Sequence, residues 1–438
     1  MRTSNNKIIR DVELFDRLFP QYQKIIGDLS SKFKTYESSE FENLVNFQSN
    51  LTSPKHGWYD YKQGYSELLV KNIISRSNPD RAHYILDPFC GVGTTNLTAQ
   101  SMGYMSLGTD INPMAILATE VKTHFFTVDE KRAIEESINS FSLPECKETI
   151  SSKVVNTSFT DEVLDVILRI KFFVESTEEI YVQKFFRLAL ISIIDVCSLK
   201  VKDGNGLKFK KNYKPVPDIV ALYLEKCHKM LDDIRKSNSS IDCIALLGSL
   251  LNKDIFEKIQ DKKVGLCLFS PPYANCFDYC EVYKLELWIG GFVKSYGDFD
   301  KYRSMALRSH VNSKFSHDFY SIIPEVDTIA SLISAFNIWN KNIPDMLRGY
   351  FDDMKLLLEN VFKLLIPGAR CFIVVANSAY KGILVPTDLI LSDIAEKIGY
   401  KCEGISVARR IRASSQQMKG LYETYDNLMR ESIIELKK

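Results

Sequence analysis

The sequence YILDPFCGVGTTNLTAQSMG, residues 84–103, decides the predicted fold. Its first four residues form a short apolar run typical of a buried strand, and a glycine-rich turn follows directly. The small and polar residues after the turn indicate a helix that ends at Gly103. A strand, a glycine-rich turn and a helix in this order predict the opening unit of a parallel α/β sheet.

Six further segments have the pattern of buried strands and alternate with helical patterns. The first of them, residues 104–110, ends in Asp110 and precedes another helix. Seven strands with intervening helices predict a doubly wound, Rossmann-like α/β sheet, whose ligands bind at the carboxyl ends of the strands. The remaining strand candidates are residues 243–248, 264–270, 370–377, 401–410 and 431–438.

Two stretches interrupt this alternation and divide the chain. Residues 126–240 are mainly amphipathic helix, and residues 274–350 are rich in loops, aromatic residues and charges. Both follow strands, where a doubly wound sheet builds its site. We therefore expect an N-terminal helical extension (1–55), a core domain (56–125 and 241–438), a helical insertion (126–240) and a loop-rich insertion near the site (274–350).

Composition narrows the class of protein. The chain has 438 residues, a net charge of +1 and 45% hydrophobic residues, which excludes wholesale disorder, and no apolar run approaches a membrane span. The first residues lack a secretory h-region. The ten cysteines lie mostly in apolar runs, without the spacing of a metal site. We expect a reduced, cytoplasmic protein without a metal, in which any polyanion site is a local patch.

The glycine-rich turn has the chemistry of a nucleotide-type ligand site. Gly91 and Gly93 let the backbone approach a ligand closely, but the third glycine of a dinucleotide motif and the GK[ST] of a P-loop are absent. Asp87 ends one strand, where it could pair with an ammonium group. Asp110 ends the next, 110 − 87 = 23 residues on, where a ribose-binding acid lies in this topology. An ammonium group together with a ribose favours S-adenosylmethionine over a dinucleotide.

A second motif, Ser270-Pro271-Pro272-Tyr273, follows the strand VGLCLF. The two prolines stop the strand and stiffen the backbone. The Ser270 hydroxyl and nearby carbonyls can accept hydrogen bonds from an exocyclic amine, and the ring of Tyr273 offers a face on which a base stacks. Such acceptors would orient the nitrogen lone pair towards a methyl donor, without a strong base.

DPFCGVGTT followed by SPPY resembles the amino-methyltransferases that act on exocyclic nitrogens of DNA, and SPPY is closest to the cytosine-N4 branch. The segments 65–74 and 374–382 are similar to further parts of that family. The resemblance implies a seven-stranded methyltransferase sheet, S-adenosylmethionine as cofactor, and duplex DNA with a flipped target base as substrate. It also implies a restriction-modification or phage-defence setting, a prokaryotic, nucleoid-associated location, and a separate chain for any restriction endonuclease.

The resemblance also assigns roles to individual residues. Ser270, Pro271, Pro272 and Tyr273 would hold the target base. Many members place a residue for the cofactor's adenine after the strand 243–248, where Ser249 and Asp254 both remain open. The cofactor-binding positions would be Tyr65, Ser66, Asp87, Phe89, Cys90, Gly91, Gly93, Thr94, Asp110, Ile111 and Asn112.

Contacts to DNA phosphates need cationic side chains. One candidate patch lies in the insertion 126–240, the candidate target-recognition region, and another follows the strand 401–410. We expect the DNA-binding residues to include Lys208, Lys210, Lys211, Arg409, Arg410 and Arg412, although a lysine run is equally typical of a solvated hairpin.

Three other functions remain open at this point. Adenine-N6 methylation of DNA is the closest, followed by methylation of an exocyclic amine in RNA and by a binding module that keeps the fold without the chemistry. A cytosine-C5 enzyme is excluded, because it needs a cysteine nucleophile after proline and the sequence has no Pro-Cys dipeptide.

Overall fold

In the computed structural model, an eight-stranded sheet forms the centre of the molecule, in the order β1-β11-β12-β8-β7-β2-β3-β6. The structure describes the chain except for residues 1–8, 62, 147–148, 204–205, 313–320 and 412–422. All seven predicted strands are present: β2 (Tyr84–Asp87), β3 (Ser106–Asp110), β6 (Cys243–Leu247), β7 (Val264–Phe269), β8 (Leu365–Ala376), β11 (Lys401–Arg410) and β12 (Arg430–Lys437).

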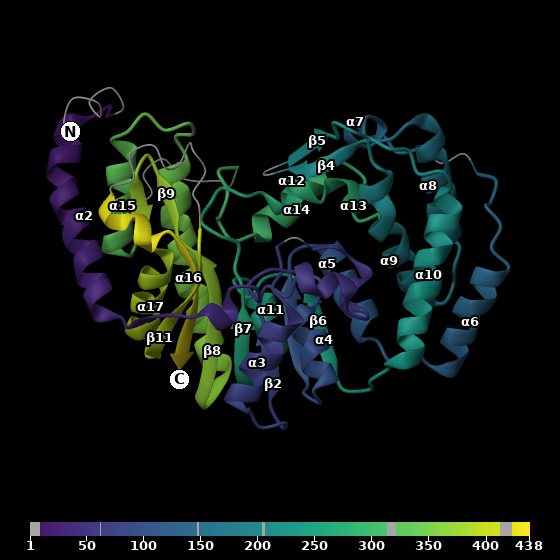
Figure 1. Ribbon diagram of the computed structural model, residues 1–438, viewed down its shortest axis with the longest axis horizontal. Helices are drawn as coiled ribbons and strands as arrows, with labels where there is room; N and C mark the ends of the chain where they lie inside the picture. Colours follow the sequence, from purple (N-terminus) through teal and green to yellow (C-terminus); the bar gives the residue numbers. More distant parts are fainter. Residues whose placement is uncertain (1–8, 62, 147–148, 204–205, 313–320, 412–422) are drawn as a thin grey trace.

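The sheet is mostly parallel. Strands β6, β3, β2, β7 and β8 run in the same direction, and β12 is antiparallel to both of its neighbours, β8 and β11. The carboxyl ends of the parallel strands therefore meet at one edge, beneath the short helices α12 (Tyr279–Val282), α13 (Lys284–Ile289) and α14 (Gly297–Met305) (Figure 1). This is the predicted doubly wound, Rossmann-like sheet, with one additional strand.

Alternating side chains of the central strands face two apolar layers. In β7, Leu266 and Leu268 pack on the side of α3 (Glu67–Ser77), and Cys267 and Phe269 pack on the side of α16 (Ile343–Leu364). The sheet is thus buried on both faces, as parallel sheets require. Helices α4 (Thr94–Ser101), α5 (Pro113–Thr123) and α17 (Thr387–Ile398) also contact the sheet, α11 (Lys253–Ile259) connects β6 to β7, and α15 (Pro324–Ser334) packs on α16.

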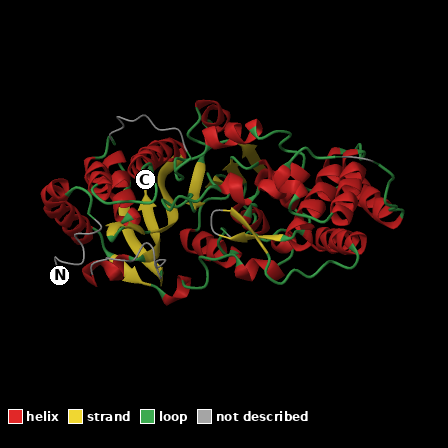
Figure 2. Cartoon of the chain, turned by 90° about the horizontal axis from the view of Figure 1, so that it is seen from above, coloured by secondary structure: helices red, strands yellow, loops and turns green. Residues whose placement is uncertain are grey.

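The insertion at 126–240 forms a separate helical layer beside the sheet (Figure 2). It packs its own apolar cluster against α5 and α13. Between its last two helices lies a two-stranded hairpin. The elements are α6 (Val128–Asn139), α7 (Lys153–Asn156), α8 (Asp161–Glu175), α9 (Ile180–Cys197), β4 (Lys200–Asp203), β5 (Gly206–Phe209) and α10 (Ile219–Lys236).

The N-terminal segment differs from the predicted helical extension. Helix α2 (Val12–Lys32) is followed by β1 (Thr35–Glu37), which pairs in parallel with the outer edge of β11. Short 3-10 turns then occupy Ser39–Phe41, Gln48–Thr52 and His56–Trp58, with a further turn at Glu423–Leu428 and a small ladder of β9 (Ser378–Tyr380) and β10 (Ile383–Val385) elsewhere. Strand β1 covers the edge of β11 that would otherwise be open. Within the described residues, no helix has the length and apolar content of a membrane span.

Candidate active site

The glycine-rich turn joins β2 to α4 at the carboxyl edge of the sheet. Gly91 and Gly93 have φ angles of +50° and +80°, which favour glycine. Neighbouring side chains also leave no space for a Cβ atom at either position. A Cβ atom on Gly91 would lie 2.9 Å from the ring of Tyr61, and one on Gly93 would lie 2.8 Å from the Thr119 hydroxyl. The turn is therefore a close-fitting cradle in which only glycine is accommodated at these two positions.

Asp110 at the end of β3 is tied to this turn. One carboxylate oxygen accepts the backbone N–H of Gly91 at 2.9 Å, and the other accepts that of Asn112 at 2.8 Å. Asn112 in turn caps α5 by accepting the N–H of Met114. Burial raises the pKa of Asp110 to about 6, against the effect of these backbone hydrogen bonds.

A single cavity connects the two predicted motifs. The space between them amounts to about 900 Å³ when its open mouth is included. Phe89, Asp110, Ile111 and Asn112 line it, and so do Ser270 and Pro272. The structure therefore brings some of the predicted cofactor positions and two of the four SPPY residues to the same space.

Several predicted residues are not among the described residues that line this cavity. Asp87 is one of them, because its carboxylate is used internally. It accepts hydrogen bonds from the hydroxyls of Tyr65 (2.8 Å) and Thr95 (2.7 Å) and from the backbone N–H of Phe89 (3.0 Å). Burial raises the pKa of Asp87 to about 6. Asp87 and Tyr65 thus hold the glycine-rich turn from behind rather than facing the cavity.

The other predicted positions outside the lining also make internal contacts. Ser66 caps α3 by accepting the N–H of Leu68. Cys90 is buried, which raises the pKa of its thiol well above the usual range. Thr94 opens α4, and its carbonyl accepts the hydroxyl of Thr98.

The SPPY turn is anchored to the antiparallel side of the sheet. The Tyr273 hydroxyl donates to Glu431 on β12 at 2.5 Å, and Arg409 on β11 donates to the other oxygen of that carboxylate at 2.5 Å. Pro271 is buried, whereas Ser270 and Pro272 are partly exposed into the cavity. Ser270 therefore borders a space that is shared with Asp110.

Other cavity residues were missed from the sequence. Tyr61 stacks on Tyr283 with ring centroids 5.3 Å apart, and the Tyr283 hydroxyl donates to Gln63. Tyr61 and Gln63 line the cavity from the segment before α3. Of the two residues left open for the adenine, Ser249 lies in the lining and Asp254 lies in the first turn of α11.

The loop-rich segment supplies the opposite wall. Asp278 is buried in the lining and accepts hydrogen bonds from Arg303 (3.2 Å), Asn312 (3.3 Å) and the N–H of Cys280 (3.0 Å). His310 lines the same wall. Because the spacing of these residues in the sequence follows no helical or strand period, only the fold brings them together.

The predicted lysine patch is a hairpin whose charges are unequally available. Lys208 is 71% exposed and pairs with Asp203 at 2.5 Å, and Lys211 is exposed. Lys210 donates to the carbonyl of Asp195 in the last turn of α9 at 2.7 Å, which is a structural contact. Lys202, which belongs to the same run, is buried against Asp195 and Glu286.

The predicted arginine set is also partly paired. Arg409 contacts Glu431, and Arg410 forms an ion pair with Glu37 on β1. Both side chains remain nearly half exposed, so contacts to a polyanion stay open to them. Arg412 lies outside the described residues.

Comparison with known proteins adds to this geometry. Residues 17–120 match a family model of N6/N4 methyltransferases described as DNA methylase. The Type II methyltransferase M.BsoBI of Geobacillus stearothermophilus is 27% identical over 86% of this chain and 85% of its own length. The Type II methyltransferase M.AvaI of a Nostoc species is 25% identical over 95% of this chain and 92% of its own length. These matches support the amino-methyltransferase family.

Two solved structures are also similar in part. A TehB-like S-adenosylmethionine-dependent methyltransferase from Corynebacterium glutamicum has 10% identity and a TM-score of 0.28, over 85% of this chain and 87% of that one. The rRNA methyltransferase aviRa from Streptomyces viridochromogenes has 9% identity and a TM-score of 0.30, over 89% of this chain and 92% of that one.

The match to the N6/N4 methyltransferase model supports S-adenosylmethionine as the cofactor. The cavity fits such a group. Asp110 offers a carboxylate for hydroxyl groups, and Phe89, Ile111 and Pro113 offer apolar surface for a ring.

Proposed function

We propose that this chain transfers a methyl group from S-adenosylmethionine to the exocyclic N4 amine of cytosine in duplex DNA. The observation that supports it is the shared cavity, in which Phe89 and Asp110 border one part and Ser270 and Pro272 border another. An amine held at Ser270 and a cofactor held at Asp110 would occupy one continuous space. The similarity to Type II methyltransferases supports DNA as substrate and a restriction-modification setting.

The residues that would bind the cofactor are those of the lining near β2, β3 and β6. Asp110 would accept hydrogen bonds from the ribose, and Ser249 would serve the adenine edge. Phe89 and Ile111 would pack on the adenine ring. When bound, S-adenosylmethionine supplies an electrophilic methyl group.

The SPPY turn would position the amine. The Ser270 hydroxyl oxygen and a backbone carbonyl of this turn accept the two N–H bonds, so that the lone pair points away from them. The same acceptors stabilise the positive charge that develops on nitrogen. The contact from Tyr273 to Glu431 fixes the turn. Tyr273 itself packs partly buried against the core and is not among the described residues that line the cavity. A strong base is not required, because the proton leaves an already charged nitrogen.

The target base must leave the helix to reach this cavity. We infer that the helical insertion 126–240 and the segment 274–350 contact the DNA, with Lys208, Lys211, Arg409 and Arg410 on phosphates. Any restriction endonuclease would be a separate chain.

Isotope-labelled S-adenosylmethionine and duplex DNA, followed by digestion to nucleosides and mass spectrometry, test the proposal. We expect label in N4-methylcytosine. Label only in N6-methyladenine would replace the cytosine assignment by adenine, and transfer to tRNA but not to duplex DNA would replace the substrate class.

A further inference from the structure

Lys122 on α5 is buried beneath the glycine-rich turn. Only 1% of the residue is exposed, and its amino group lies 3.1 Å from the carbonyl oxygen of Val92 and 3.3 Å from that of His56. Among the described residues, no carboxylate forms an ion pair with it. A lysine buried in this way is costly unless its donors are used, and here two backbone carbonyls use them.

The first carbonyl belongs to the centre of the glycine-rich turn. Val92 stands between Gly91 and Gly93. One turn earlier on α5, the Thr119 hydroxyl donates to the Gly91 carbonyl at 3.0 Å. Helix α5 therefore fixes two successive carbonyls of the turn, and Asp110, just before this helix, fixes the N–H of Gly91.

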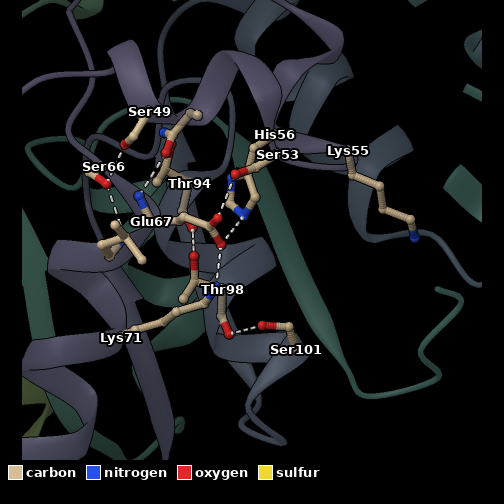
Figure 3. Close-up of polar contacts among 12 residues, drawn as sticks. Ser49, Ser53, Lys55, His56, Ser66, Glu67, Lys71, Thr94, Thr98 and Ser101 are labelled. Carbon is tan, nitrogen blue, oxygen red and sulfur yellow. Dashed lines mark hydrogen bonds and ion pairs between the residues drawn. The ribbon is translucent and has the colours of Figure 1, made fainter. Parts of the chain in front are cut away.

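The second carbonyl belongs to residues 49–61, which we call the strap. The strap is pinned to α3 through Glu67, whose carboxylate accepts the Ser53 hydroxyl at 2.6 Å and lies 3.5 Å from the His56 ring (Figure 3). It is pinned to α10 through Asp233, which accepts the Trp58 indole N–H at 2.9 Å. The path of the strap is thus fixed on both sides of His56.

The strap ends at the cavity. Its last residue, Tyr61, lines the cavity and packs so closely on Gly91 that a Cβ atom there would lie 2.9 Å from the ring. The strap and the glycine-rich turn therefore meet twice, directly at Tyr61 and through the amino group of Lys122.

We propose that Lys122 is a positioning residue that sets the separation between the strap and the glycine-rich turn, and with it the width of the cofactor end of the cavity. This inference rests on the cofactor site described above. Burial and the nearby charge of Lys226 lower the pKa of Lys122 to about 7. The neutral amine still has two N–H donors, so the hydrogen bonds from Lys122 to the carbonyls of Val92 and His56 persist in either protonation state.

The test is the affinity of Lys122→Met for S-adenosylmethionine and S-adenosylhomocysteine, measured by calorimetry without DNA. Methionine keeps much of the stem and removes both donors. We expect a dissociation constant raised about 10-fold, the order expected for losing one to two net hydrogen bonds. Hydrogen exchange should also show that ligand binding protects residues 56–61 in the wild type but no longer in the variant.

Lys226→Met is the matched control. Lys226 is also largely buried, and its amino group lies 3.5 Å from the Gly57 carbonyl, so it reaches the strap but not the Val92 carbonyl. We expect its cofactor affinity to stay within about 2-fold of wild type. Equal losses in both variants, or wild-type affinity in Lys122→Met, would overturn the inference.

A failure of the proposed function and a folding defect of the variant can each be told apart from a failure of this inference. A wild-type chain that binds neither ligand would instead contradict the proposed function. If Lys122→Met does not fold, Lys122→Gln, whose shorter amide cannot span both carbonyls, replaces it. Weakened binding in Lys122→Gln is expected, and wild-type binding would again overturn the inference.

Discussion

The backbone N–H of Gly91 donates a hydrogen bond to the carboxylate of Asp110 over 2.9 Å. This contact joins the turn after β2 to the end of β3, so the acid is oriented before any ligand arrives. Preorganised groups of this kind lose less entropy on binding. Asp110 is partly buried, and its raised pKa gives the site a measurable pH dependence.

We predict that S-adenosylmethionine binds more weakly as the pH falls through about 6. Hydroxyl donors favour the carboxylate form of Asp110, and the pKa of about 6 means that protonation competes in this range. Calorimetry at pH 5 to 8 measures the effect. Asp110→Asn should bind more weakly at pH 8 and show a flatter profile; an unaltered profile would assign the titration to another group.

Asp87→Asn is expected to change the free energy of unfolding and the way in which it depends on pH. The pKa of Asp87 is raised to about 6 in the folded chain, so its protonated form is favoured there. Its contribution to the free energy of unfolding is therefore fully present below about pH 4, the usual pKa of an aspartate, and is lost as the pH rises through about 6. Denaturant unfolding of wild type and variant across this window measures the difference.

Tyr65→Phe serves as the companion variant, since it removes only the hydroxyl that contacts Asp87. We expect it to lower the free energy of unfolding by about 1–2 kcal/mol, because a buried hydrogen-bond partner is lost. Cofactor affinity should change less than in Asp110→Asn. A cofactor loss larger than that of Asp110→Asn would mean that Tyr65 faces the ligand.

Ser270→Ala is expected to lower kcat by about 100-fold, by analogy with the loss of one hydrogen-bonding group that stabilises developing charge. The affinity for S-adenosylmethionine should stay near wild type, because Ser270 would serve the amine and not the cofactor. Single-turnover methyl transfer and calorimetry measure the two quantities. Ser270→Thr, which keeps a hydroxyl, is the control, and an equal loss of turnover and cofactor affinity in Ser270→Ala would contradict the assigned role.

Lys208→Gln combined with Lys211→Gln is expected to weaken DNA binding and to flatten its salt dependence. Each phosphate contact contributes a slope of about −0.9 in log affinity against log salt, so two lost contacts would reduce the slope by nearly 2. Lys229→Gln, at an exposed position of α10, is the control. An unchanged slope in the double variant would make the hairpin a solvated surface element.

The sheet was predictable because each core strand is a short apolar run that ends in a recognisable turn or acid. Strand β11 spans the predicted residues 401–410, and β7 ends one residue before the predicted limit. Strand β1 was missed, since its three residues are exposed and carry no apolar pattern. It forms through a tertiary contact with the edge of β11.

The sequence motifs of the candidate site could be predicted, but the residues that complete the lining of the cavity could not. Phe89, Asp110 and Ser270 follow strands, and strand ends converge at one edge of a parallel sheet. Tyr61, Asp278 and His310 come from irregular segments, whose route depends on contacts far away in the sequence.

Long-range pairing also explains the lysine patch. Lys202 looks like its neighbours in the sequence, but it is buried against Glu286, which lies 84 residues further along the chain.

A crystal structure of the chain with S-adenosylhomocysteine tests the central claim most directly. The account predicts ligand density inside the shared cavity, with the ribose at Asp110 and the sulfur facing the Ser270 side. Density in another part of the molecule, or a ligand that is separated from Ser270 by protein, would contradict it.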